Sequence, residues 1–118
     1  MKLKAEEIAA AVQAQRLDAS GSIVPSGYSI DSRTLAAGEC FIAIQGPNFD
    51  GHEFIGAALR QGAALVIARA DTQSPIEAGW PVIRVDDTLS ALQRLANFTR
   101  RKWGKTVIAI TGSTGKTT

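Results

Sequence analysis

Several residue types on which whole classes of protein depend are scarce in this sequence. It contains one cysteine and one histidine, and its formal net charge is +2. A single thiol offers no disulfide framework and suits a reducing compartment. The one histidine, His52, has no cysteine or second histidine at ligand spacing, which disfavours a metal centre of the zinc type. A net charge this small gives no indication of a nucleic-acid-binding surface.

Long apolar runs are also missing. No uninterrupted apolar stretch approaches the roughly 18 residues that indicate a membrane-spanning helix. The N-terminus, from Met1 to Glu7, has no apolar signal core. We therefore expect a cytoplasmic protein without membrane insertion.

What is present is the composition of an ordinary globular domain. Hydrophobic residues make up 45% of the 118 residues and charged residues 20%, which is enough apolar material for one domain with its own core. The cysteine lies in the apolar run Cys40–Ile44, so we expect it to be buried as a small hydrophobic side chain.

Apolar strands alternate with amphipathic helices along the chain. Helices are predicted over 5–15, from Asp50 to Gly62, and from Asp86 or Asp87 to about Trp103. Strands are predicted to begin at Tyr28 and to cover 40–44, 64–68, 82–85 and 106–110. This order predicts an α/β fold with helices packed on a small mixed sheet. We place a domain boundary near Gly104, with 1–104 forming one domain and 105–118 beginning another.

Two of the predicted helices carry more detailed expectations. Asp50 and Glu53 have the spacing of a capping box, and Phe49 and Phe54 that of a hydrophobic staple. Periodicity predicts the faces that the helices bury. These are Phe54, Ala57, Ala58 and Gln61 in the second helix, and Leu89, Leu92, Ala96 and Trp103 in the third.

The most informative stretch closes the sequence. Four apolar residues, Val107–Ile110, run into a glycine-punctuated loop that ends in Lys116, Thr117 and Thr118. This is typical of a phosphate-binding loop: backbone N–H groups surround a polyphosphate, the lysine reaches its outer phosphates and the next hydroxyl binds Mg²⁺. The residues predicted to hold the nucleotide are Gly112, Ser113, Thr114, Gly115, Lys116, Thr117 and Thr118. The alternative, a polar turn with an exposed lysine, does not explain the buried strand that leads into it.

Two further polar clusters could bind a ligand. In Asp31-Ser32-Arg33 the arginine fork suits bidentate contact with phosphate or carboxylate, and the serine adds a hydroxyl. Spacing alone favours a different interpretation, a turn in which Asp31 caps local N–H groups and pairs with Arg33 at the surface. Asn48 and His52 could bind a ligand at a helix start, although the cap and the staple explain their neighbours without one.

Taken together, these segments resemble one family. Ser29–Arg33, Gly38–Gly46 and Asn48–His52 resemble the N-terminal domain of the Mur ligases, and Thr111–Thr118 resembles the ATP loop of that family. The family uses the short form Gly-x-x-Gly-Lys-[Ser/Thr]-[Ser/Thr]. Ile110, which stands where the general pattern has its first glycine, is therefore no anomaly. The resemblance covers nearly the whole chain in the right order.

The resemblance implies a cytoplasmic ATP-dependent amide ligase of peptidoglycan-precursor synthesis, monomeric at full length. In such ligases the N-terminal domain binds the UDP end of the nucleotide-sugar peptide, and a central domain binds ATP and Mg²⁺. The chain is most similar to members that join D-alanyl-D-alanine to UDP-N-acetylmuramoyl-tripeptide through an acyl phosphate. Lys116 and Thr117 would then be catalytic, with Thr117 as the Mg²⁺ ligand. Asp31, Ser32 and Arg33 would meet the substrate, with Asn48 and His52 nearby.

Three alternatives stay open. The chain could belong to a family member that adds the third amino acid, although that group typically has Gly-Thr-Asn-Gly in its loop. It could be a non-catalytic module that binds a UDP-sugar. A small kinase fits poorly, because its phosphate loop normally follows the first strand of the domain. We expect these 118 residues alone to lack ligase activity.

Overall fold

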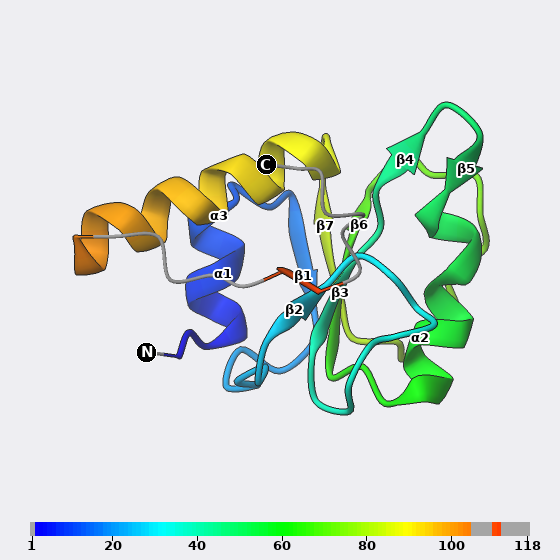
Figure 1. Ribbon diagram of the computed structural model, residues 1–118, viewed down its shortest axis with the longest axis horizontal. Helices are drawn as coiled ribbons and strands as arrows, with labels where there is room; N and C mark the ends of the chain where they lie inside the picture. Colours follow the sequence, from blue (N-terminus) through cyan, green and yellow to red (C-terminus); the bar gives the residue numbers. More distant parts are fainter. Residues whose placement is uncertain (1, 105–109, 112–118) are drawn as a thin grey trace.

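The computed structural model describes residues 2–104 and 110–111, which form a mixed sheet with helices packed on it (Figure 1). The elements, in chain order, are α1 Ala5–Ala11, β1 Arg16–Asp18, β2 Tyr28–Ser29, β3 Cys40–Ile42, β4 Gln45–Gly46, β5 Phe49–Asp50, a 3₁₀ turn η1 Gly51–Phe54, α2 Ile55–Gln61, β6 Leu65–Arg69, β7 Val82–Val85, α3 Thr88–Trp103 and β8 Ile110–Thr111. The α/β fold class predicted from the sequence is confirmed.

The main sheet has six strands in the order β1-β7-β6-β3-β2-β8. Only the pair β1–β7 is antiparallel, and the other four pairs are parallel. The sheet is therefore mixed, as predicted. The carboxyl ends of five neighbouring strands share one edge, which we call the carboxyl edge.

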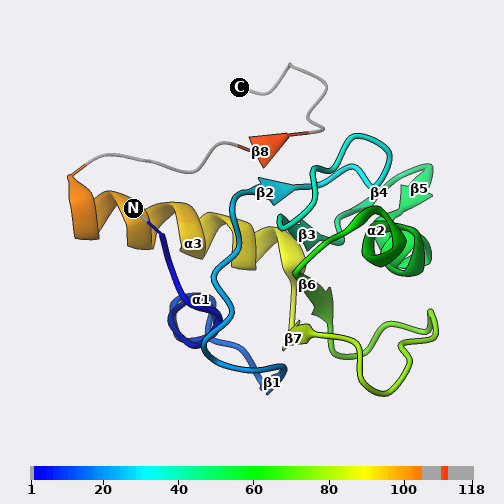
Figure 2. The same cartoon turned by 90° about the horizontal axis from the view of Figure 1, so that it is seen from below.

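Two hydrophobic cores lie on opposite faces of this sheet, because successive side chains of a strand point to opposite sides. On one face α1 and α3 contribute Ile8 and Leu95 to a cluster with strand residues such as Cys40. On the other face α2 contributes Ile55 to a cluster with Phe41. Figure 2 shows α1 and α3 on one side of the strands and α2 on the other. Cys40 is fully buried, as expected, and burial raises the pKa of its thiol.

The first helix is shorter than predicted. It ends at Ala11, and Gln13 has a φ of 57°, in the left-handed region that normally favours glycine. After this turn β1 pairs with β7 at the sheet edge, a strand that the sequence did not predict. Gly62 and Gly104 end the two later helices, with positive φ values of 114° and 79°.

The segment around Asp50 also differs in part. Residues 45–50 form a two-stranded hairpin, β4–β5, where the sequence predicted only an interruption. The Asp50 carboxylate accepts from the His52 N–H at 3.0 Å, and the next turn is 3₁₀. The Asp50 side chain therefore caps the N–H of His52, whereas the predicted capping box would use the N–H of Glu53. The predicted contact between Phe49 and Phe54 is confirmed, with ring centroids 5.9 Å apart.

The buried faces of both later helices agree only in part with those predicted. In α3 the predicted Leu92 and Trp103 are half-buried against the core, but the fully buried side chains include Ala91 and Leu95, and Leu89 is 53% exposed. In the second helix the predicted Ala58 is buried together with Ile55, whereas the predicted Phe54 is 41% exposed. A 3₁₀ turn, η1, precedes α2, whereas the predicted face assumed a continuous α-helix from Asp50.

The sixth strand is β8, which pairs with β2 in parallel, with Ser29 opposite Thr111. The remainder of the predicted strand over 106–110 and the predicted phosphate loop over 112–118 lie outside the described residues. The domain boundary near Gly104 stays a prediction.

Candidate functional site

Polar residues collect at the carboxyl edge of the sheet. Asp31–Arg33 follow β2, the β4–β5 hairpin follows β3, Arg69 is the last residue of β6, and Asp87 precedes α3 after β7. In open sheets with parallel strands, ligands bind outside the carboxyl ends of the strands. The topology therefore brings the predicted substrate residues of the described part of the chain to one edge.

The Asp31–Arg33 turn is held by a forked ion pair. The Asp31 carboxylate accepts from the Arg33 backbone N–H at 2.8 Å, from Nε at 3.0 Å and from Nη2 at 2.9 Å. Hydrogen bonds from the Arg33 side chain and backbone hold the pKa of Asp31 below its usual range. The Arg33 side chain is nevertheless 85% exposed, and Ser32 is half-buried beside it. The local pair that spacing favoured is thus present, and it fixes an outward-facing guanidinium.

Asn48 lies at the tip of the hairpin. Pro47 and Asn48 form the two-residue turn between β4 and β5, and both are exposed. Because β3 and β2 are adjacent in the sheet, Asn48 and Arg33 are carried by segments that leave neighbouring strands. Both side chains are exposed at the carboxyl edge, so each is accessible to a ligand there.

Gly51 explains why the chain can turn so tightly after the hairpin. Its N–H donates to the Ile44 carbonyl at 2.9 Å. A Cβ at this position would lie 2.9 Å from the Ile44 nitrogen and 3.2 Å from the Ala43 Cα. A side chain would push the 3₁₀ turn away from the end of β3, so this close approach of two backbones requires glycine.

His52 lies under the hairpin and does not point toward solvent. It is 2% exposed, its Nδ1 lies 2.7 Å from Asp50 Oδ1, and its Nε2 accepts from the Arg69 N–H at 2.9 Å. A carboxylate accepts and a backbone N–H donates, so this pattern fits the neutral tautomer protonated at Nδ1. Burial pushes the pKa of Asp50 up, but the hydrogen bonds from His52 outweigh it and the pKa lies below its usual value. Both ring nitrogens of His52 are thus engaged within the protein.

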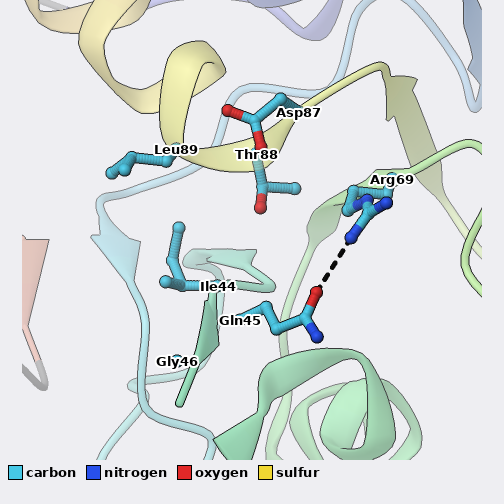
Figure 3. Close-up of a pocket in the computed structure, with 7 residues that line it drawn as sticks. All are labelled: Ile44, Gln45, Gly46, Arg69, Asp87, Thr88 and Leu89. Atoms are coloured by element: carbon cyan, nitrogen blue, oxygen red, sulfur yellow. Dashed lines mark hydrogen bonds between the residues drawn. The ribbon is translucent and has the colours of Figure 1, made fainter.

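A pocket of about 270 Å³ opens beside the hairpin (Figure 3). It is lined by Ile44, Gln45, Gly46, Arg69, Asp87, Thr88 and Leu89. Arg69 Nη1 donates to Gln45 Oε1 at 2.8 Å, and Nε and Nη2 donate to the two carboxylate oxygens of Asp71 at 3.1 and 3.2 Å. Arg69 is not among the residues predicted from the sequence. Its one signal there is an arginine at the end of an otherwise apolar strand.

The residues predicted to bind ATP and Mg²⁺, including Lys116 and Thr117, lie outside the described residues. Within 2–104 and 110–111, no group of three or more histidine, cysteine or acidic residues is arranged to hold a metal ion. No helix in the same part of the chain combines the length and apolar character needed to cross a membrane.

Comparison with known proteins identifies the family of this chain. The family described as Mur ligase family, catalytic domain, matches residues 25–100. The chain belongs to the Mur ligase family. This confirms the resemblance inferred from the sequence.

Curated relatives of this chain include Mur ligases of two kinds. UDP-N-acetylmuramoyl-tripeptide–D-alanyl-D-alanine ligases (MurF) from Bacillus subtilis (strain 168) and Treponema pallidum (strain Nichols) are 44% and 40% identical, over 78% and 100% of this chain. A UDP-N-acetylmuramoyl-L-alanyl-D-glutamate–2,6-diaminopimelate ligase from Rhizobium meliloti (strain 1021) is 35% identical over 90% of it. The chain spans 20%, 28% and 21% of these three relatives, respectively.

Solved structures show the same fold. A crystal structure of MurF from Acinetobacter baumannii matches 86% of this chain with a TM-score of 0.74 and 26% identity, and the chain covers 22% of it. MurF from Thermotoga maritima, solved in complex with ADP, matches 66% of this chain with a TM-score of 0.52 and 32% identity. In that match the chain covers 17% of the Thermotoga protein. These 118 residues thus match only a part of each of these longer proteins.

Proposed function

We propose that this chain is the substrate-recognition part of a Mur ligase that joins D-alanyl-D-alanine to UDP-N-acetylmuramoyl-tripeptide. The observation that carries the proposal is the exposed guanidinium of Arg33, which Asp31 fixes at the carboxyl edge. It follows β2, and the hairpin with Asn48 follows the neighbouring strand β3. A planar cationic fork fits the diphosphate of a UDP-sugar, and an amide side chain can donate to and accept from polar groups of the same ligand. The names of the MurF relatives supply the substrate class.

Each of the described residues has a separate role in binding. Arg33 meets the diphosphate, the Ser32 hydroxyl hydrogen-bonds to the same part of the substrate, and Asn48 reaches it from the hairpin. His52 does not touch the substrate in this scheme, because both of its ring nitrogens are engaged, but it fixes the base of the hairpin. Binding of this kind holds the precursor in place and contributes to the reaction by orientation.

The nucleotide site lies in the segment 112–118. We propose that the backbone from Gly112 to Gly115 surrounds the ATP phosphates, that Lys116 contacts the outer ones and that Thr117 holds Mg²⁺. ATP, when bound, supplies the phosphoryl group that activates the terminal carboxylate of the tripeptide. We propose that the complete ligase acts as a monomer in the cytoplasm, on a water-soluble UDP-linked precursor.

Calorimetry on this chain tests the substrate assignment. We expect saturable binding of UDP-N-acetylmuramoyl-tripeptide, weakened at least tenfold in Arg33→Ala, because a charge-assisted hydrogen bond is worth about 1.5–3 kcal/mol. Arg16→Ala is the matched control. Arg16 also pairs with an aspartate two residues later, Asp18, but on the opposite border of the sheet. Equal weakening in both variants, or no binding by the unmodified chain, would refute the assignment.

A second candidate is a ligase that adds the third amino acid. It is favoured by the relatives that are named as 2,6-diaminopimelate ligases and are 32–39% identical. Binding of UDP-N-acetylmuramoyl-dipeptide in preference to the tripeptide by the full-length ligase would decide for this candidate.

A further inference from the structure

We infer that Arg69 is a positioning residue for the substrate, because it holds both strands of the β4–β5 hairpin so that Asn48 meets the ligand. The inference rests on the proposed function and extends it to a residue that does not itself touch the substrate. It is built on the contacts of one side chain and one backbone N–H at the end of β6.

The two strands of the hairpin are tied to Arg69 by different groups. The guanidinium donates to Gln45 Oε1 on β4 at 2.8 Å. The backbone N–H donates to His52 Nε2 at 2.9 Å, and His52 Nδ1 lies 2.7 Å from the carboxylate of Asp50, the last residue of β5. A single residue of the main sheet thus anchors both strands of the hairpin.

The hairpin needs such an anchor. It pairs only Gln45 with Asp50 and Gly46 with Phe49, and it forms a small sheet separate from the six-stranded one. Isolated two-stranded hairpins are marginally stable in water. If its anchors were removed, the exposed turn at Asn48 would sample more conformations, and ordering it would reduce the affinity for the substrate.

Arg69 is suited to this role because its own side chain is fixed. Two of its N–H groups donate to the Asp71 carboxylate and a third donates to Gln45. The side chain lines the pocket and is 34% exposed. Figure 3 shows the guanidinium pointing across the pocket toward Gln45. A lysine has one ammonium group and no planar fork, so it cannot reproduce this arrangement.

Binding measurements on a small set of variants test the inference. Calorimetry with UDP-N-acetylmuramoyl-tripeptide would compare the unmodified chain with Arg69→Gln, Arg69→Lys, Gln45→Ala and the double variant Arg69→Gln/Gln45→Ala. We expect each single variant to weaken binding about tenfold, since each loses one charge-assisted hydrogen bond between β6 and β4. The double variant should bind no more weakly than Arg69→Gln, because both changes break the same link.

A control and a second readout separate positioning from general stability. Arg84 on β7 is another ion-paired arginine, and its Nε lies 2.9 Å from the carboxylate of Asp18 on β1. Arg84→Gln should leave the Kd unchanged even if the thermal midpoint falls. In Arg69→Gln, hydrogen exchange of the backbone amides of Gly46, Asn48, Phe49 and Asp50 should accelerate before any substrate is added, while that of α1 stays the same.

Each other outcome overturns a defined statement. An unchanged Kd in Arg69→Gln, or slow exchange of the hairpin amides in that variant, contradicts the positioning role. Fully additive losses in the double variant would mean that Arg69 acts on the substrate independently of Gln45. If the unmodified chain does not bind the tripeptide, the proposed function fails, and the exchange measurement still reports whether Arg69 holds the hairpin.

Discussion

Three consecutive residues fix the turn between the hairpin and α2, each by a different physical effect. Asp50 accepts the His52 N–H, Gly51 allows two backbones to approach, and His52 connects the turn to Arg69. The cap at Asp50 and the contact between Phe49 and Phe54 could be predicted from the sequence, because both involve residues only a few positions apart. It did not indicate the partner of His52, since that partner lies 17 positions away and is a backbone N–H that every non-proline residue has.

Substitution of Gly51 tests this local account. Gly51→Ala should lower the free energy of unfolding by about 1–3 kcal/mol, because the new Cβ would meet the backbone of Ile44 at 2.9 Å. Gly56→Ala is the control. In α2 a Cβ at Gly56 has ordinary contacts at 3.5 Å, so alanine should stabilise the chain by up to about 1 kcal/mol. Urea unfolding measures both values, and a similar change in the two variants would contradict the close-approach argument.

At the scale of elements, long apolar or amphipathic segments could be predicted and short ones could not. β6, β7 and α3 lie close to their predicted positions, because each has a sustained pattern and a clear end signal. β1 has a single apolar residue, Leu17, and is a strand only because β7 offers it a partner. The hairpin was missed for a similar reason, since its strands have two residues each and Pro47 interrupts the pattern.

The start of α3 gives a prediction for an element as a whole. Asp87 caps the helix by accepting the Ser90 N–H at 2.9 Å, so Asp87→Ala should cost about 0.5–2 kcal/mol of stability at pH 7. The neighbouring Asp86→Ala should cost less, because Asp86 is 62% exposed and forms a surface ion pair with Arg94 at 3.6 Å.

This cost should depend on pH in one direction. The hydrogen bond from the Ser90 backbone holds the pKa of Asp87 below its ordinary value. A carboxyl group with a lowered pKa in the folded state stabilises the fold fully above its unfolded pKa of about 3.9 and loses that contribution as pH falls through the folded value. The difference in stability between the unmodified chain and Asp87→Ala should therefore shrink below about pH 4. A difference that grew on acidification would contradict the capping role.

At the scale of the whole molecule, parallel strand order explains why the candidate site could be predicted in part. The resemblance supplied Arg33 and Asn48, and the topology shows that the segments carrying them leave adjacent strands. Arg69 and the pocket beside it depend on β6 lying next to β3, a tertiary pairing that spacing does not reveal. The same order places β8 beside β2, with Thr111 opposite Ser29.

The proportion of the relatives that this chain covers leads to a prediction about activity. Because it spans 20% and 28% of the two MurF relatives, we expect the 118 residues alone to form no amide product and to bind ATP·Mg²⁺ only weakly. A coupled assay for ADP release and calorimetry with ATP·Mg²⁺ measure the two properties. Micromolar binding of ATP·Mg²⁺ by this chain would contradict the second expectation.

The central claim is that the carboxyl edge of the sheet recognises the UDP-linked precursor, and mapping of amide shifts tests it most directly. The ¹⁵N-labelled chain would be titrated with UDP-N-acetylmuramoyl-tripeptide while its backbone amide resonances are followed. We predict saturable shifts at Asp31–Arg33 and in the hairpin around Asn48, and none in β1 on the opposite border of the sheet. Shifts confined to β1, or no saturable shift at the carboxyl edge, would contradict the claim.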